Sequence, residues 1–260
     1  QDKNTKIIFL KKLYFKNKYS NIKYNDFPSK DSFKKIKVKN KIYKVKMLRD
    51  ENLRRRINDF KSYFDNKHIL DFGAGWGGFL SKIKKKKTIT AFELRNECLN
   101  FLKKKKINTT NNLNELKNNF YEFVSLFHVY EHIPNQIEIL KKINSKMKKG
   151  GKLILEVPHA NDFLIKSDIK KFKDFIFWSE HLILHTEKSL KKFLRLSKFT
   201  KVKFLYKQRY NFNNHMKWII DKEPSGHSKN LKSNNELCSL YEKYLIRNKL
   251  TDTIIAIATK

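Results

Sequence analysis

LDFGAGWGGFL, from Leu70 to Leu80, contains four of the seven glycines in this chain of 260 residues. The apolar run HILDF that leads into it is typical of a buried strand. Glycines that follow such a strand let the backbone turn tightly and approach a ligand closely. We therefore predict a strand, a turn at Gly73, Gly75 and Gly77, and a helix over 78–87 with a ligand at its N-terminus.

Strand and helix signals alternate along the rest of the chain. Five strand-then-helix units in a row imply a parallel sheet with helices on both faces, because parallel neighbours need crossover connections. The expected fold class is α/β, with a doubly wound, seven-stranded, mostly parallel sheet whose last strand is antiparallel. Gly150 and Gly151 are predicted to stop the helix before the fifth strand. The predicted strands are 68–72, 88–94, 107–108, 123–127, 152–158, 201–206 and 252–259, and further helices are predicted over 96–106, 112–119 and 137–150.

The chain is long enough for one sizeable domain with an appendage. Residues 1–47 show the weakest pattern and are predicted to be a lead-in or cap, with two short strands around Lys39-Asn40. A helical period begins at Asp50 and runs to Phe64. We expect the main domain over 48–260, with a substrate-binding insertion at about 207–235.

The charge balance is strongly basic. Lys and Arg number 59 against 25 Asp and Glu, a net charge of +34 that is commonly read as attraction to nucleic acid, anionic membranes or acidic substrates. The excess is spread along the chain without a single basic block, which favours compositional bias. Two cysteines, Cys98 and Cys238, exclude a disulfide scaffold and a cysteine-type zinc site. No apolar run reaches the roughly 18 residues of a membrane span, so we expect a cytoplasmic protein.

Two carboxylates distinguish between ligands for the glycine turn. Gly73, Gly75 and Gly78 satisfy the dinucleotide fingerprint G-x-G-x-x-G. Asp71, two residues before the first of these glycines, would repel a pyrophosphate but suits a cationic ligand, through a direct contact or by tying down the loop. Glu93 ends the second strand, where a carboxylate can accept both hydroxyls of a ribose. S-adenosylmethionine is a nucleoside with a positive charge and no pyrophosphate.

On these residues the chain resembles the class I, Rossmann-like SAM-dependent methyltransferases, from about Leu53 to Lys260. Their motif D-x-G-x-G-x-G is matched from Asp71 to Gly77. The chain departs from the family after the third strand, where TTNNLNEL lacks the acid that many members place near adenine, and Asn111 or Asn112 is the substitute. The resemblance implies S-adenosylmethionine as cofactor, bound by Asp71, Gly73, Ala74, Gly75, Trp76, Gly77, Glu93, Asn112 and His128.

Two Glu-His pairs are the candidates for catalysis. FHVYEHIP, which contains Glu131 and His132, resembles a segment of one bacterial branch of these enzymes and is predicted to open the next helix. FWSEHLILHT is similar to a segment of sugar C-methyltransferases in which the histidine is a base, so His181 is the implied general base, oriented by Glu180 or Glu131. The alternatives are a capping or packing role for His132 and a structural hydrogen bond for His181. His185 is assigned to the start of a helix at Thr186.

The predicted insertion carries an unusual set of side chains. KQRYNFNNHMKWIIDKEPSGH, from Lys207 to His227, resembles a segment of polysaccharide-associated methyltransferases. Polar donors and an aromatic platform suit a sugar, a phosphate or a nucleotide-sugar, whereas the alternative is a merely structural insertion. The candidate substrate-binding residues are Trp178, Arg209, Tyr210, Asn214, His215, Trp218 and His227.

The function expected from the sequence is methyl transfer to a hydroxyl, or a carbon, of a sugar, nucleotide-sugar or cell-surface polysaccharide precursor. The partner is then a small molecule, and no metal site is predicted. The alternative is an RNA or DNA methyltransferase, which the charge favours. His128 to Glu131 does not match the Asn/Asp-Pro-Pro-aromatic motif of enzymes that methylate base amino groups, and no RNA-binding module is recognisable. A third hypothesis is a non-enzymatic SAM-binding protein with a degenerate site. The presence of Asp71, the motif glycines and Glu93 disfavours it.

Overall fold

The computed structural model describes residues 2–9, 33–38, 41–46, 50–84, 86–178, 181–223 and 235–260. Its contacts divide the chain into two compact units. The glycine-turn unit comprises 14–126, 141–153 and 259–260, and the histidine unit comprises 1–13, 127–140 and 154–258. Each is described by itself.

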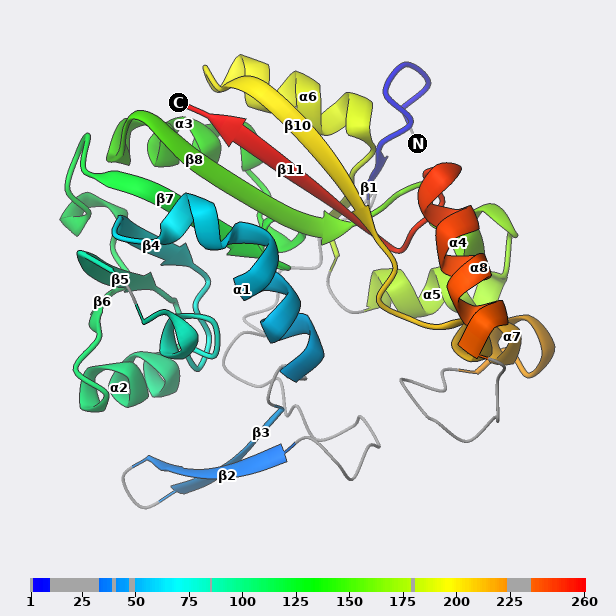
Figure 1. The fold of residues 1–260 in the computed structure, drawn as a ribbon, viewed down its shortest axis with the longest axis horizontal. Coiled ribbons are helices and arrows are strands. Elements are labelled where there is room, and N and C mark those ends of the chain that lie inside the picture. Colours follow the sequence, from blue (N-terminus) through cyan, green and yellow to red (C-terminus); the bar gives the residue numbers. More distant parts are fainter. Residues whose placement is uncertain are drawn as a thin grey trace. The chain divides into compact units, whose positions relative to one another are not determined.

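A seven-stranded sheet in the order β10-β11-β8-β7-β4-β5-β6 confirms the predicted α/β class (Figure 1). β4 pairs in parallel with β5 and β7, and β5 pairs in parallel with β6. β11 runs opposite to β8 and β10, as predicted for the last strand. The strands are β4 (His68–Phe72), β5 (Thr88–Phe92), β6 (Asn108–Thr110), β7 (Tyr121–Phe127), β8 (Met147–Pro158), β10 (Thr200–Lys207) and β11 (Thr253–Thr259).

Eight α-helices and two small antiparallel sheets complete the described residues. The pair β2 (Phe33–Val38) and β3 (Lys41–Lys46) confirms the two strands predicted around Lys39-Asn40. β1 (Ile8–Phe9) pairs with β9 (Ile183–Leu184) in the histidine unit. None of the described helices is both long and apolar enough to cross a membrane. The helices are α1 (Asp50–Phe64), α2 (Asn96–Lys104), α3 (Gln136–Lys146), α4 (Phe163–Lys166), α5 (Lys170–Trp178), α6 (Glu187–Leu196), α7 (Phe212–Ile220) and α8 (Asn235–Arg247).

The core of the glycine-turn unit explains why α1 forms where the period predicts it. Phe60 and Phe64 lie on the buried face of α1, and the Phe64 ring meets Phe79 and Phe123 edge-on at 5.7 and 5.6 Å between centroids. Ile69 on β4 is fully buried in the same unit. Burial of these large apolar side chains stabilises the strand that leads into the glycine turn.

The helix predicted over 78–87 is wrong. Within 78–84 and 86–87, which the structure describes, there is only a short 3₁₀ turn, from Leu80 to Lys82. Gly75 and Gly77 have φ of +54° and +73°, so the backbone cannot be helical before Gly78. Phe79, Leu80 and Ile83 are nevertheless buried, so the apolar side chains of this stretch pack without a helix.

The predicted boundary at Gly150-Gly151 is also wrong. α3 ends at Lys146 and β8 begins at Met147, so both glycines lie inside the strand. A Cβ at Gly151 would lie 2.9 Å from the Lys148 carbonyl oxygen and 3.1 Å from that of Tyr121. The glycine therefore permits a close approach of neighbouring backbone rather than ending a helix.

Candidate functional site

The glycine turn is fixed by backbone hydrogen bonds to the end of β5. The amides of Gly73 and Ala74 donate to the Phe92 carbonyl over 2.7 and 3.1 Å, and the Gly77 amide donates to the Ala74 carbonyl over 2.9 Å. A Cβ at Gly77 would lie 2.5 Å from Leu102 Cδ2, and the φ of +73° is strained for any other residue, so glycine is favoured there. The tight turn predicted at these glycines is present, with positive φ at Gly73, Gly75 and Gly77, and its role in binding a ligand stays a prediction.

Asp71 is a buried carboxyl at the end of β4. Its Oδ1 accepts a hydrogen bond of 2.7 Å from Ser125 Oγ on β7. Burial raises the pKa of Asp71 to about 6, although the Ser125 hydrogen bond and the charge of Arg56 oppose this rise. The Ser125 hydrogen bond ties the end of β4 to β7, and the role of Asp71 toward a cofactor stays a prediction.

Glu93, directly after β5, connects to the glycine turn. Its Oε2 accepts a hydrogen bond of 2.7 Å from the Gly75 amide, and its Oε1 accepts from the Leu94 and Arg95 amides, each over 3.0 Å. The Arg95 guanidinium lies 3.2 Å from Oε1. Sequence reasoning missed Arg95. Glu93 and the turn form one hydrogen-bonded unit.

Trp76 and Asn112, two further residues predicted to bind the cofactor, contact other residues of the glycine-turn unit. The Trp76 ring packs edge-on against Phe101, with centroids 5.4 Å apart. Asn112 caps the 3₁₀ turn Leu113–Glu115, and its Oδ1 accepts from the Asn114 amide over 3.0 Å. Their role toward a cofactor stays a prediction.

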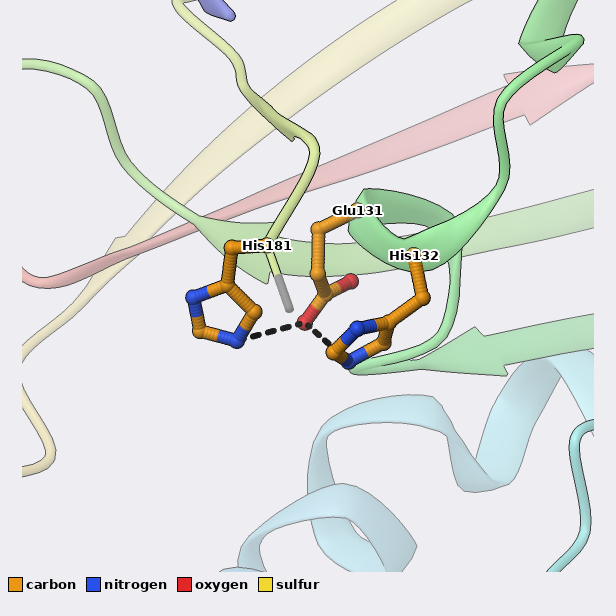
Figure 2. Close-up of side chains that lie close together, drawn as sticks. All are labelled: Glu131, His132 and His181. Atoms are coloured by element: carbon orange, nitrogen blue, oxygen red, sulfur yellow. Dashed lines mark ion pairs between the residues drawn. The ribbon is translucent and has the colours of Figure 1, made fainter. Parts of the chain in front are cut away.

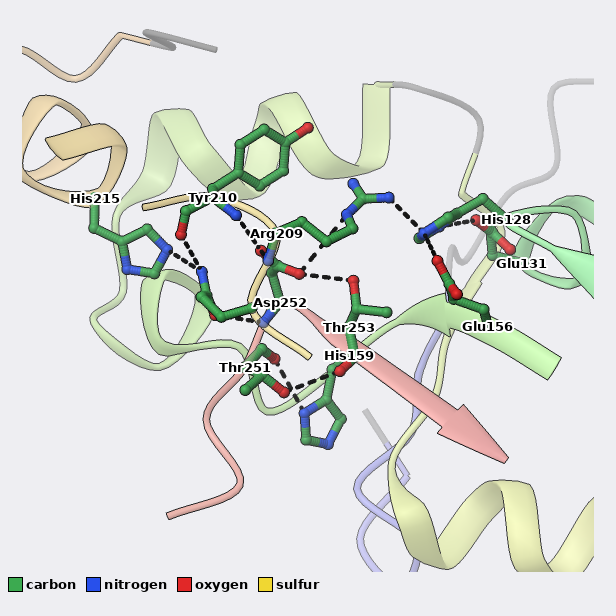
Figure 3. Close-up of polar contacts among 11 residues, drawn as sticks. His128, Glu131, Glu156, His159, Arg209, Tyr210, His215, Thr251, Asp252 and Thr253 are labelled. Carbon is green, nitrogen blue, oxygen red and sulfur yellow. Dashed lines mark hydrogen bonds and ion pairs between the residues drawn. The ribbon is translucent and has the colours of Figure 1, made fainter. Parts of the chain in front are cut away.

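His128 begins a buried polar network in the histidine unit (Figure 3). It follows β7 with φ of +55°. Its Nδ1 lies 3.3 Å from Glu131 Oε1, its Nε2 lies 3.3 Å from Glu156 Oε1, and Arg209 Nη1 contacts Nε2. With its proton on Nδ1, His128 donates to Glu131 and accepts from Arg209. Sequence reasoning missed Glu156, an acid within the apolar run LILEV of β8.

Glu131, His132 and His181 come together in the same unit, and Figure 2 shows both imidazoles turned toward the carboxylate. The Nε2 atoms of His132 and His181 each lie 3.9 Å from Glu131 Oε1. The Leu182 amide donates to the Glu131 carbonyl over 2.9 Å and so joins the two chain segments. Glu131 and His132 do not open α3 as predicted; they lie in a separate 3₁₀ turn, Tyr130–His132. Ile133 is extended, so the backbone leaves the helical conformation before α3 begins at Gln136.

The ionisation states of this cluster follow from burial and mutual charge. Burial opposes ionisation of Glu131, but the hydrogen bond from His128 and the nearby imidazoles lower the pKa of Glu131 to about 2. Burial lowers the pKa of His181 to about 4, against the charge of Glu131. At neutral pH the cluster therefore combines an ionised carboxylate with a neutral His181, which has a lone pair to offer a proton or a metal ion.

The helix start predicted at Thr186 is confirmed, and His185 directly precedes it. Its Nε2 lies 2.7 Å from Gln136 Oε1 and its Nδ1 lies 3.0 Å from Ser189 Oγ. Thr186 caps α6 in a capping box with Ser189. This fully buried histidine anchors the segment that carries His181.

The predicted substrate residues divide into two groups. Arg209 lies beside His128, and the Arg209 and Tyr210 amides donate to Asp252 Oδ2 over 2.8 and 3.0 Å. His215 and Trp218 instead pack within α7 and its neighbours: His215 Nδ1 lies 2.8 Å from the Tyr241 hydroxyl, and the buried Trp218 ring meets Phe172. Asn214 is buried on α7 as well. Glu180 and His227 lie outside the described residues, and for Trp178 the backbone alone is described.

Known proteins of similar sequence pattern and fold are methyltransferases. The family described as methyltransferase domain matches residues 47–203. A search of curated protein sequences finds no match. Three similar solved structures come from different organisms. A SAM-dependent methyltransferase from Archaeoglobus fulgidus is 19% identical, with a TM-score of 0.55 over 81% of this chain and 94% of that one.

The other two are comparably distant. A SAM-dependent methyltransferase from Thermotoga maritima is 15% identical, with a TM-score of 0.54 over 80% of this chain and 89% of that one. Phosphoethanolamine N-methyltransferase 2 of Haemonchus contortus, in complex with phosphomonomethylethanolamine and S-adenosylhomocysteine, is 16% identical, with a TM-score of 0.53 over 81% of this chain and 52% of that one. At these identities the likenesses show the fold alone, whereas the family match covers more than half of the chain. The chain therefore belongs to the methyltransferase domain family, with S-adenosylmethionine as its expected cofactor.

Proposed function

We propose that this methyltransferase transfers a methyl group to a hydroxyl, or a carbon, of a sugar, nucleotide-sugar or cell-surface polysaccharide precursor. The supporting observation is the buried Glu131 carboxylate with His181 Nε2 3.9 Å away. Removal of a proton from a hydroxyl or a carbon acid needs a neutral base and a group that stabilises the base once it is charged. His181 and Glu131 have these ionisation states at neutral pH.

The glycine turn fits the cofactor through its backbone and its carboxylates. The positive φ of Gly77 favours glycine, and hydrogen bonds to Phe92 and Glu93 fix the backbone of the turn. S-adenosylmethionine, when bound, supplies the sulfonium methyl group. In this proposal Glu93 accepts the ribose hydroxyls, and Asp71 contributes negative charge and holds the turn to its neighbouring strand.

The residues of the histidine unit have separate roles in the proposal. His181 Nε2 accepts the proton of the acceptor, and Glu131 orients His181 and stabilises its charged form. Arg209 is held against His128 and offers a guanidinium to a phosphate or carboxylate of the acceptor. His215 and Trp218 position the insertion instead, because both are buried in contact with neighbouring aromatic side chains.

A substitution at His181 tests the assigned base. We expect His181→Asn to lower turnover by roughly 10²–10⁴-fold while the dissociation constant for S-adenosylmethionine stays near the wild-type value. Turnover is followed by transfer of labelled methyl groups to a panel of nucleotide-sugars, and cofactor binding by calorimetry. His68→Asn serves as the matched control, because His68 lies on β4 in the other unit and contacts Thr88. Wild-type turnover in His181→Asn would refute the role.

The second candidate function is methylation of RNA or DNA, which the net charge of +34 favours. A nucleic-acid substrate should bind with a strong dependence on salt and should accept the methyl group. Tight binding without methyl transfer would show only the effect of charge.

A further inference from the structure

The histidine unit holds a group of side chains with the composition of a metal centre. One ligand atom each from Glu131, His132 and His181 lies within 4.8 Å of the other two. Imidazole nitrogen and carboxylate oxygen are common ligands of first-row divalent metal ions, and two histidines with one glutamate form recurring three-residue sites. The chemistry of this donor set thus matches a transition-metal ion better than magnesium or calcium, which prefer oxygen.

The Glu131 carboxylate carries an unpaired buried oxygen in addition to the oxygen that faces the imidazoles. Its side chain is fully buried, and its Oε2 has no hydrogen-bond partner among the described residues. A buried, unpaired carboxylate oxygen is costly, so such an atom in a folded protein calls for a ligand, an ion or a water molecule. Figure 2 shows this carboxylate between the two imidazoles, with Oε1 directed toward the Nε2 atoms of His132 and His181.

The distances are compatible with closure around one ion. Ligand atoms bonded at about 2.1 Å to a tetrahedral ion lie about 3.4 Å apart, so side-chain movements on the order of 1 Å bring the three atoms to that spacing. His128 would orient the Glu131 ligand, because its Nδ1 contacts Glu131 Oε1 while its Nε2 contacts Glu156 and Arg209. Such hydrogen bonds to a ligand commonly fix the geometry of metal sites.

We propose that Glu131, His132 and His181 bind one divalent transition-metal ion, for which Zn²⁺ is a suitable probe. Binding of the ion is independent of the proposed function, but a catalytic role for the ion rests on the proposed function. An ion at this site would hold the oxygen of the acceptor hydroxyl and lower its pKa, so that the proton leaves to solvent. A metal-bound Nε2 cannot accept a proton, so His181 is a ligand in the loaded protein and a base only without the ion.

Calorimetric titration of Zn²⁺ into the untagged, chelator-treated full chain tests the site. We expect one Zn²⁺ per chain, with the affinity lowered at least about tenfold in Glu131→Gln and in His132→Asn. His68→Asn is the control and should bind Zn²⁺ like the wild type. His68 lies on β4 and belongs to the glycine-turn unit, whereas the cluster belongs to the histidine unit. Thermal unfolding followed by circular dichroism checks that each variant folds. If Glu131→Gln does not fold, His132→Asn decides, because its side chain is 28% exposed and tolerates substitution better.

The outcomes separate the ion from the methyl transfer. Absence of saturable Zn²⁺ binding, or equal affinity in the wild type and His132→Asn, overturns the metal site even if the protein methylates a sugar. Saturable binding that both variants weaken supports the metal site even if no sugar is methylated, and in that case the proposed function fails alone. Chelator treatment that lowers methyl transfer, with Zn²⁺ restoring it, further supports the catalytic role.

Discussion

Asp71 and Glu93 have different surroundings although both are acids near the carboxyl ends of neighbouring strands. Asp71 is buried against Ser125, and its charge is disfavoured by burial. Glu93 accepts hydrogen bonds from the Gly75 amide and from Arg95. One acid thus holds the strand that enters the turn, and the other holds the turn itself.

The raised pKa of Asp71 predicts a pH-dependent stability. Because the pKa in the folded protein, about 6, lies above the reference value of 3.8, the folded state binds more protons between these values. This contribution is fully present below about pH 4 and is lost as the pH rises through about 6, at a cost of about 3 kcal/mol in the free energy of unfolding. Asp71→Asn should remove this dependence, measured by urea unfolding at several pH values. If the free energy of unfolding of Asp71→Asn changes with pH in the same way as that of the wild type, the raised pKa of Asp71 is contradicted.

Glu93→Ala should weaken binding of S-adenosylmethionine by about tenfold or more, because it removes the proposed ribose acceptor and the partner of the Gly75 amide. Isothermal calorimetry measures the dissociation constant directly. Glu97→Ala is the matched control, since Glu97 lies nearby in the first turn of α2 and should leave binding unchanged. Equal affinity in Glu93→Ala and the wild type would sink the ribose assignment.

Helix α6 carries its own N-terminal cap. The Ser189 amide donates to Thr186 Oγ1 over 3.2 Å, the Thr186 amide donates to Ser189 Oγ over 2.9 Å, and Thr186 Oγ1 donates to the Thr5 carbonyl over 2.6 Å. Thr186→Ala should therefore lower the free energy of unfolding by about 1–2 kcal/mol, which is measurable by denaturant unfolding. Lys188→Ala, at an exposed position of the same turn, should change it little. Equal free energies of unfolding for Thr186→Ala and Lys188→Ala would show that the cap does not stabilise the protein.

The sequence predicts the strands well because their apolar runs are bounded by glycines, charges or turn residues, as at β4 and β11. It fails over 78–87, at Gly150-Gly151, and over 112–119, where the structure has a 3₁₀ turn from Leu113 to Glu115 instead of the predicted helix. After the glycine turn the chain forms a 3₁₀ turn instead of the predicted helix, and at Gly151 the close approach of the backbone places glycine inside a strand. These outcomes depend on how each segment packs in the folded protein, which local composition does not specify.

The candidate site was only partly predictable. The Glu-His motifs indicate Glu131, His132 and His181, and the structure brings these three together. Glu156 and Asp252 were missed because an acid within or beside an apolar strand shows its partners only after folding. The predicted substrate residues His215 and Trp218 turn inward on α7, since the pattern of the insertion does not reveal which face packs. Side-chain chemistry was readable from the sequence, whereas side-chain direction was not.

At the scale of the whole molecule, the charge of +34 predicts nonspecific binding to RNA. We expect affinity for unrelated RNA sequences to be similar and to fall steeply as salt rises from low to physiological concentration, because counterion release drives such binding. Filter binding at several salt concentrations measures this. A strong preference for one sequence, maintained at high salt, would instead indicate a specific nucleic-acid substrate.

The most direct test of the account is methyl transfer from labelled S-adenosylmethionine to a panel of nucleotide-sugars and glycan precursors, with RNA and DNA in parallel. The account predicts label in a small sugar-containing product, and loss of that label in His181→Asn but not in His68→Asn. Label found in RNA or DNA alone, at a rate that His181→Asn does not change, would contradict it.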